Sequence, residues 1–142
     1  MYHKILLVGN LGRDPEMRMT PSGTSVTNFS MATSEKWTGQ DGQPQERTLW
    51  WRVSVFGKMG EACNEYLKKG SKVLVEGRMN ADPKTGNPRI WQGQDGQMRA
   101  SFEVTASTVK FLSSRSENSG SGGAGGPGVM DAEPADETEI PF

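Results

Sequence analysis

The chain has 142 residues, of which 33% are hydrophobic; this suits a single domain with one modest core and leaves little for a second. Its net charge of −1 conceals a division, because all 16 Lys and Arg residues lie within residues 1–115. They face 11 acidic residues there, a balance of +5, whereas residues 116–142 hold 6 acidic residues and no basic ones. A basic body suits a polyanionic partner and an acidic tail is typical of an interaction segment, although a solvated surface with a solubilising tail is the alternative.

The rare residue types exclude several classes of site. With Cys63 as the single cysteine and His3 as the single histidine, no disulfide framework can form within the chain, and we expect neither a metal site nor a cofactor. The apolar run at 5–8 follows the N-terminus without a basic leader, and no stretch approaches the ~20 apolar residues that cross a membrane. We therefore expect a soluble, cytoplasmic protein.

Hydrophobic periodicity predicts a mainly extended chain with one helix. The extended segments are expected at about 3–10, 16–34 with a turn at 21–23, 45–57, 71–80 and 99–112, and the helix at 59–69. The helix is indicated by apolar residues at i, i+3, i+4, i+7 and i+8, which predict one buried face: Met59, Ala62, Cys63, Tyr66 and Leu67.

The sequence also indicates where the helix ends, and a long loop is expected on each side of it. Lys68 and Lys69 would complement the dipole of its C-terminus, and Gly70 would end it. Two long loops are expected at 37–45 and 80–98, and loops of this length usually carry function. No internal repeat is apparent.

The segment 49–56 is the most informative, because its two faces differ. Leu49, Trp51, Val53 and Val55 form an apolar face that belongs in the core or in an interface. The other face combines two rings suited to stacking with a guanidinium suited to phosphate or cation–π contacts, and it consists of Trp50, Arg52, Ser54 and Phe56. This face predicts a binding platform, although rings on strands also pack under loops.

Two further tryptophans favour the binding interpretation. Trp37 opens one expected loop and Trp91 lies in the other, close in sequence to Lys36 and Arg89 respectively. Exposed rings beside cations can stack bases of any sequence, at ~1–3 kcal/mol per base. A phosphate loop, a dinucleotide fingerprint, a nuclease-like carboxylate cluster and a duplex-reading helix are all lacking, so we expect a non-enzymatic binder of single strands.

The C-terminal part changes composition. Residues 113–130 are rich in Gly and Ser and predict a disordered linker with a root-mean-square span of roughly 25 Å. Residues 131–142 are acidic and end in Ile140-Pro141-Phe142, which predicts a docking peptide whose acidic residues approach a basic patch while its apolar side chains fill a small pocket.

Four segments strongly resemble the bacterial single-stranded DNA-binding protein family: 5–16 (ILLVGNLGRDPE), 32–37 (ATSEKW), 50–58 (WWRVSVFGK) and 65–71 (EYLKKGS). The resemblance covers nearly all of 1–112 and resumes at the terminus, in 136–142 (DETEIPF). It implies an all-β, five-stranded oligonucleotide-binding barrel (OB-fold) over residues 1–112 with one short helix between strands. It also implies a homotetramer that binds single-stranded DNA and recruits replication, recombination and repair proteins.

The resemblance carries roles over to individual positions. Base-stacking aromatics would be Trp37, Trp50, Phe56 and Trp91. Phosphate contacts would come from Arg52, Lys58, Lys68 and Lys69, with Arg18 and Arg89 as further candidates. The partner-docking residues would be Asp136, Glu137, Glu139, Ile140, Pro141 and Phe142. An RNA-binding or primosome-type barrel is the alternative, but such relatives need no acidic Ile-Pro-Phe tip.

Overall fold

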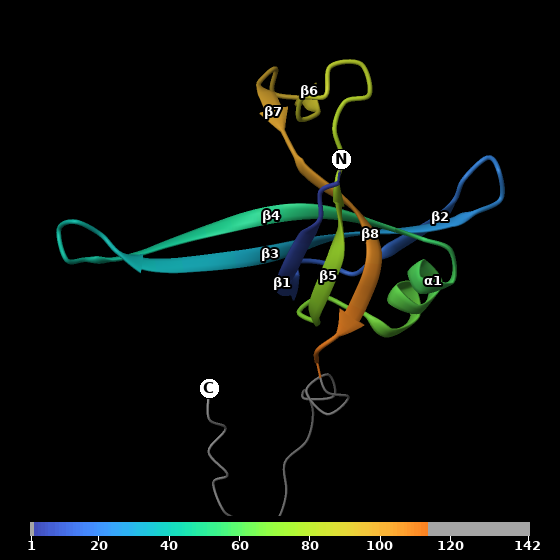
Figure 1. Cartoon of the computed structure of the whole chain (residues 1–142), viewed down its shortest axis with the longest axis horizontal. Helices are drawn as coiled ribbons and strands as arrows, with labels where there is room; N and C mark the ends of the chain where they lie inside the picture. The colour runs from blue at the N-terminus through green and yellow to red at the C-terminus, as the bar shows by residue number, and fades with distance from the viewer. Residues whose placement is uncertain (1, 114–142) are drawn as a thin grey trace, which may run out of the picture.

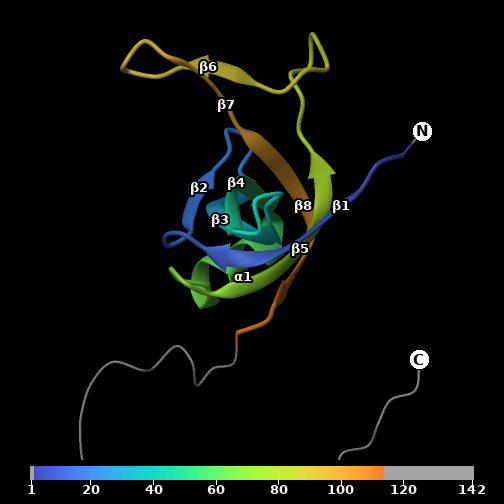
Figure 2. The same ribbon diagram turned by 90° about the vertical axis from the view of Figure 1, so that its left-hand side faces the viewer.

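The computed structural model describes residues 2–113 (Figure 1). Within them, six strands form one sheet in the order β1 (Ile5–Leu11), β5 (Lys72–Met79), β8 (Phe102–Phe111), β4 (Pro44–Phe56), β3 (Ser25–Thr38) and β2 (Glu16–Met19). β1 also pairs with β3, through Asn10↔Ala32 and Leu11↔Met31, so five of these strands close into a barrel. The β4–β8 pair is parallel and the others are antiparallel. The predicted five-stranded OB-fold is confirmed, and Figure 2 shows the barrel after a quarter turn.

The core follows from alternation along the strands. On β4 the inward residues Trp51, Val53 and Val55 are at most 8% exposed. The indole N–H of Trp51 donates a hydrogen bond to Thr33 Oγ1 (2.9 Å), and its ring lies 5.1 Å from that of Phe102. Trp51 is therefore a core residue of the barrel, which decides between the two expectations for this face. Further buried apolar residues come from the other strands and the helix: Leu7, Leu11, Phe29, Met31, Cys63, Leu67, Val73, Val75, Val104 and Val109.

The helix α1 (Gly57–Tyr66) lies between β4 and β5 and ends earlier than predicted. Leu67 has extended backbone angles, and the following turn is closed by Ser71, whose N–H donates to the Lys68 carbonyl and whose Oγ accepts from the Lys68 N–H (both 3.0 Å). The chain must turn here to enter β5, so residues 67–69 leave the helix although their sequence predicted that it would continue. Lys68 and Lys69 thus lie beyond the helix, and their predicted complementarity to its dipole is wrong.

One residue of the predicted buried helix face is also exposed. Tyr66 is 58% exposed, at the last residue of α1, with its ring 6.4 Å from that of Phe111. Cys63 and Leu67 are buried as expected, and Gly60 joins them. The buried face therefore centres on Gly60, Cys63 and Leu67, and Met59 and Ala62 at its edge are half-buried.

The two expected long loops contain strands. Pairing of β3 with β4 continues to Thr38↔Pro44, so the first connection shortens to residues 39–43. Within the second, β6 (Ile90–Gln92) and β7 (Met98–Ala100) form a separate two-stranded sheet. The β3–β4 hairpin extends far beyond the barrel, and β6–β7 projects from it elsewhere (Figure 1). Hydrophobic periodicity missed these extensions because neither side of them faces a core.

The predicted linker at 113–130, apart from Ser113, and the predicted tail at 131–142 lie outside the described residues. So do the six tip residues assigned to partner docking. Among residues 2–113, no helix is both long enough and apolar enough to span a membrane.

Candidate nucleic-acid interface

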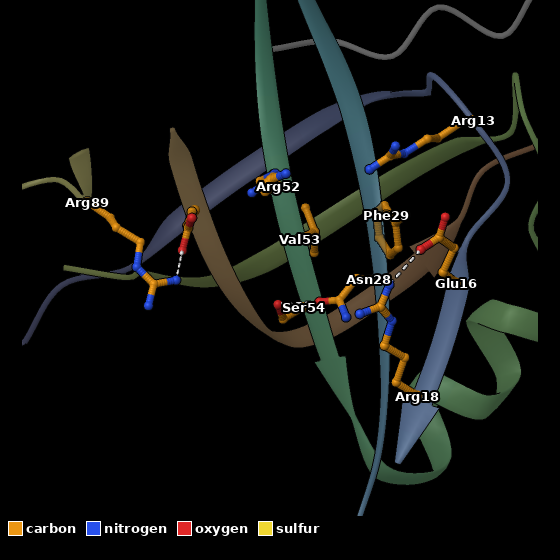
Figure 3. Close-up of a pocket in the computed structure, with 10 residues that line it drawn as sticks. Arg13, Glu16, Arg18, Asn28, Phe29, Arg52, Val53, Ser54 and Arg89 are labelled. Carbon is orange, nitrogen blue, oxygen red and sulfur yellow. Dashed lines mark hydrogen bonds and ion pairs between the residues drawn. The ribbon is translucent and has the colours of Figure 1, made fainter. Parts of the chain in front are cut away.

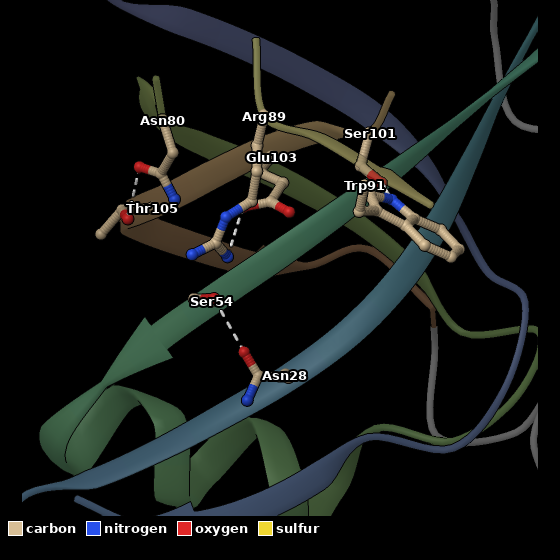
Figure 4. A network of polar contacts seen from close by, with 8 residues as sticks. All are labelled: Asn28, Ser54, Asn80, Arg89, Trp91, Ser101, Glu103 and Thr105. Carbon is tan, nitrogen blue, oxygen red and sulfur yellow. Dashed lines mark hydrogen bonds and ion pairs between the residues drawn. The ribbon is translucent and has the colours of Figure 1, made fainter. Parts of the chain in front are cut away.

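The outward face of β4 is the surface that the sequence indicated. Trp50 and Phe56 are 55% and 48% exposed, and Arg52 lies exposed between them. Across the sheet, their partners on β3 are Ala32 opposite Trp50, Ser30 opposite Arg52 and Val26 opposite Phe56. Because these partners are short, the two rings and the guanidinium stand above the surface. Ser54 completes the row and donates a hydrogen bond to Asn28 Oδ1 (2.7 Å; Figure 4).

Beside this face lies an arginine-lined cavity of about 320 Å³, here called the arginine hollow (Figure 3). Its charged lining is Arg13, Arg18, Arg52 and Arg89, with Glu16 and Glu103. Two ion pairs lie within it, Arg18 Nη2 to Glu16 Oε2 (3.6 Å) and Arg89 Nη1 to Glu103 Oε2 (3.9 Å). Four guanidinium groups facing two carboxylates leave a positive excess, which favours the binding of phosphate groups.

A second, more apolar cavity of about 440 Å³ adjoins Trp50. Trp50, Trp51 and Phe102 contribute rings to its lining. Hydroxyl groups around it come from Ser30, Thr48 and Ser101. Flat apolar walls with a few hydroxyls, which both donate and accept, suit a planar heterocycle without selecting one base.

Trp37 and Trp91 are exposed on the two projecting hairpins rather than on this face. Trp37 pairs with Gln45, so by alternation it projects from the side of the β3–β4 hairpin opposite to Trp50. Trp91 lies on β6, and its indole N–H donates to Ser101 Oγ (3.1 Å; Figure 4). Their exposed fractions are 46% and 39%.

The cations over these two rings come from the opposite strand of each hairpin. Arg47 lies over Trp37, with Cζ 5.6 Å from the ring centroid, and Arg99 lies over Trp91 at 5.9 Å. Lys36 and Arg89 are the cations close to these rings in sequence, and Arg89 is paired with Glu103. Adjacent residues on a strand point to opposite faces, so a ring meets a cation from across the hairpin.

The three predicted lysines lie apart from the arginine hollow. Lys58 is in the first turn of α1, and Lys68 and Lys69 occupy the turn before β5; none of them lines the hollow. All three are exposed. The Lys69 backbone N–H donates to Asp14 Oδ1 (2.8 Å), which ties this turn to the segment between β1 and β2.

Several residues of the site were not singled out from the sequence. Arg13, Asn28 and Glu103 line the hollow, and Arg47 and Arg99 cover tryptophans. Alternation on β3 could have indicated Asn28, which shares its face with the partners of Trp50 and Arg52. Glu103, Arg47 and Arg99 required the strand register: Glu103 is brought beside Arg52 by the parallel β4–β8 pairing, and the two arginines reach the rings from the opposite strand of each hairpin.

The buried thiol of Cys63 is not part of this surface. Burial raises its pKa to about 11, which keeps it protonated and unreactive at neutral pH. Within residues 2–113, no three or more His, Cys, Asp or Glu side chains come together as metal ligands would.

The strand order, together with a basic and aromatic outer face, defines a small barrel of the oligonucleotide-binding class. The sequence matches the single-strand binding protein family over residues 2–112. The chain belongs to this family.

Relatives named single-stranded DNA-binding protein share much of the sequence. Those of two Neisseria meningitidis strains, of serogroups A and B, are 44% identical over 118 residues, which is 83% of this chain and 64% of each relative. The chain therefore spans less than two thirds of their length. The Xylella fastidiosa protein is 44% identical over 123 residues, covering 87% of this chain and 71% of the relative.

Two solved structures share the fold. A Plasmodium falciparum SSB in complex with single-stranded DNA superposes with a TM-score of 0.65 at 27% identity, covering 80% of this chain and 97% of that one. A deletion mutant of the Thermus aquaticus single-stranded DNA-binding protein superposes with a TM-score of 0.61 at 28% identity, covering 79% and 51%.

Proposed function

We propose that the barrel binds single-stranded DNA with little sequence preference, and that it does so without a catalytic step. The observation that carries the proposal is the outward face of β4, where Trp50 and Phe56 stand exposed on either side of Arg52 and next to the arginine hollow. Rings stack on any base, and guanidinium groups neutralise phosphates. Family membership and the DNA complex of the Plasmodium relative support this proposal.

In this proposal, bases stack on Trp37, Trp50, Phe56 and Trp91. Phosphates are contacted by Arg52, Arg18 and Arg89 around the hollow, and by Lys58, Lys68 and Lys69 as the strand continues around the barrel. The single strand then passes over several faces of the molecule, because these residues do not share one surface.

Intrinsic tryptophan fluorescence tests the proposal. Titration with oligo-dT should quench the emission strongly at low salt and less at high salt, whereas a duplex of equal length should have little effect. Oligo-U of the same length is the control for an RNA-binding barrel, and tighter binding of oligo-U would favour that alternative. Absence of quenching by oligo-dT would show that the rings do not meet bases, and the proposal would fail.

We also propose that copies of the barrel assemble, as a homotetramer, through the outward face of β1 and β5. Leu6 and Val8 are 60% and 46% exposed there, and Val8 lies next to Leu74 of β5. Exposed apolar groups on neighbouring strands favour burial between copies. Sedimentation equilibrium should give four times the chain mass, and the combined L6K and V8K substitutions should lower it. A monomeric wild-type protein would refute the assembly.

For the C-terminal tip we propose docking to replication, recombination and repair proteins, in the cytoplasm and on the nucleoid. The support is its sequence, since acidic side chains precede Ile140-Pro141-Phe142. Deleting residues 137–142 should leave oligo-dT affinity equal or higher while abolishing the capture of partner proteins. Retained capture would exclude the tip as the docking element.

A further inference from the structure

The expectation that the chain contains no internal repeat is wrong for one short segment. The sequence Gly-Gln-Asp-Gly-Gln occurs at 39–43 and again at 93–97. The first copy connects β3 to β4, and the second connects β6 to β7. A tryptophan stands two residues before each copy, Trp37 before the first and Trp91 before the second. Both copies therefore form the tip of a hairpin that carries an exposed indole.

The two turns have the same hydrogen bonds. In each, the first glycine N–H donates to the carbonyl of the last glutamine (2.8 Å), and the second glycine N–H donates to the first glycine carbonyl (2.9 Å). The last glutamine N–H donates to the aspartate side chain, at 3.1 Å for Asp41 and 3.2 Å for Asp95. Gly42 and Gly96 share a φ of +77°, a left-handed conformation that favours glycine. The repeated sequence thus folds into one turn geometry twice.

Each tip also places a guanidinium over its indole. Arg99 is directly opposite Trp91, whereas Arg47 lies two residues beyond the cross-strand partner of Trp37. Both nevertheless come within 6 Å of the ring centroid, the range of cation–π contacts. A carboxylate holds each arginine: Glu35 binds Arg47 at 2.8 Å, and Asp95 binds Arg99 at 2.6 Å. Both tips thus combine an indole, a guanidinium and a carboxylate, although the arginine and the carboxylate occupy different positions relative to the tryptophan in each.

We propose that the two tips are equivalent nucleotide-binding modules, in which the indole stacks one base and Arg47 or Arg99 binds the phosphate that flanks it. The proposal deepens the single-stranded DNA binding proposed above and rests on it. One face of each ring carries the guanidinium, so the base stacks on the other. The carboxylate positions the guanidinium in advance, which reduces the side-chain entropy lost on binding.

The modules act independently because they are separate in space. In the described part of the chain, no Cα atom of β6 or β7 lies within 8 Å of one in β3 or β4. The two hairpins project from the barrel in different directions (Figure 1). A cavity of about 470 Å³ beside Trp37, lined also by Lys36 and Pro44, gives a base room at the first tip.

The test compares R47M and R99M in the full chain, with R78M as the matched control, because Arg78 lies on β5 and belongs to neither tip. Oligo-dT affinity is measured over a series of salt concentrations. Each tip variant should bind about two- to fivefold more weakly, as expected for an exposed cation–π and phosphate contact. Each should also flatten the plot of log K against log salt by about 0.7, the value for one phosphate on a single strand. R78M should match the wild type.

Further variants separate the possible outcomes. R47K and R99K keep the charge but not the planar group, so they should restore the salt slope while recovering only part of the affinity. The affinity of the double variant R47M/R99M should fall by the product of the two single factors, since the effects of distant sites add in free energy.

Wild-type affinity and wild-type salt slope in both methionine variants, with oligo-dT still bound, would overturn this proposal but not the proposed function. A response at only one tip would overturn the equivalence. Failure of the wild type to bind oligo-dT would instead refute the proposed function.

Discussion

The indole of Trp50 lies against Gly12, which precedes the segment that leads into β2. A Cβ atom added at Gly12 would come within 2.8 Å of Trp50 Cη2, closer than real Cβ atoms approach other heavy atoms. The Gly12 N–H donates to the Ser30 carbonyl (3.0 Å), which holds this backbone beside β3. Gly12 thus supports the ring from beneath and leaves its exposed part available to a base.

This contact predicts that G12A alters DNA binding with little change in stability. Trp50 is 55% exposed and can turn away from the new methyl group, so the backbone need not move. Oligo-dT affinity should fall about three- to tenfold, a part of the ~1–3 kcal/mol that one stacked base contributes. Fluorescence quenching measures the affinity, and thermal unfolding checks the fold. Combining G12A with W50A should add nothing to the loss caused by W50A; a further loss would show that Gly12 acts through another group.

Glu103 is expected to compete with phosphate for the arginine hollow. Its carboxylate, with the side chain 18% exposed, lies 3.9 Å from Arg89 and next to Arg52 in the β4–β8 register. E103Q removes this negative charge, so oligo-dT should bind about two- to fivefold more tightly, in line with the ~0.2–1 kcal/mol of an ion pair whose arginine is open to solvent. E61Q, on α1 and hydrogen-bonded to Ser25, serves as the control. Weaker binding by E103Q would mean that the carboxylate orients the arginines for the DNA.

The parts of the fold that could be predicted from the sequence are those in which one face of an element meets the core. On β4, alternation assigned Trp51, Val53 and Val55 inward and Trp50 and Phe56 outward, and the structure agrees. Burial imposes a period of two on such a strand, so a single sequence suffices. The resemblance to a known family added the closure of the barrel, which periodicity alone does not specify.

The remaining differences occur where tertiary contacts decide the local structure. The helix ends at Tyr66 because the turn closed by Ser71 leads into β5. Gly70, the residue expected to end the helix, adopts a φ of +88° within that turn, four residues beyond the true helix end, so its signal predicted a helix that was too long. The cations over Trp37 and Trp91 come from across their hairpins, so they depend on a register that sequence proximity does not reveal. Roles assigned to the C-terminal tip concern residues outside the described part of the chain and stay predictions.

The Cys63 thiol should make stability depend on alkaline pH. Burial raises its pKa from 9.0 to about 11, so between these values the folded protein retains a proton that the unfolded chain has lost. The free energy of unfolding should therefore fall as the pH rises through this window. Urea titrations between pH 8 and pH 11 should show a steeper fall for the wild type than for C63A. Equal slopes would show that the thiol ionises as readily in the folded state.

A substitution at Gly60 should destabilise the barrel while leaving the binding face intact. A Cβ atom at this position would collide with the Val55 carbonyl oxygen and lie 3.1 Å from the Val55 carbonyl carbon. The helix cannot easily retreat, because the buried Thr27 hydroxyl donates a 2.7 Å hydrogen bond to the Gly60 carbonyl. G60A should therefore lower the free energy of unfolding by about 1–3 kcal/mol, the usual cost of overpacking.

The control is N64A, an exposed substitution in the same helix, which should change the free energy of unfolding by less than about 0.5 kcal/mol. Since Trp50, Arg52 and Phe56 lie on the face of β4 opposite to the buried Val55, G60A should keep wild-type oligo-dT affinity under conditions in which it is folded. If affinity falls in proportion to stability under such conditions, then α1 and the outward face of β4 are coupled through Val55.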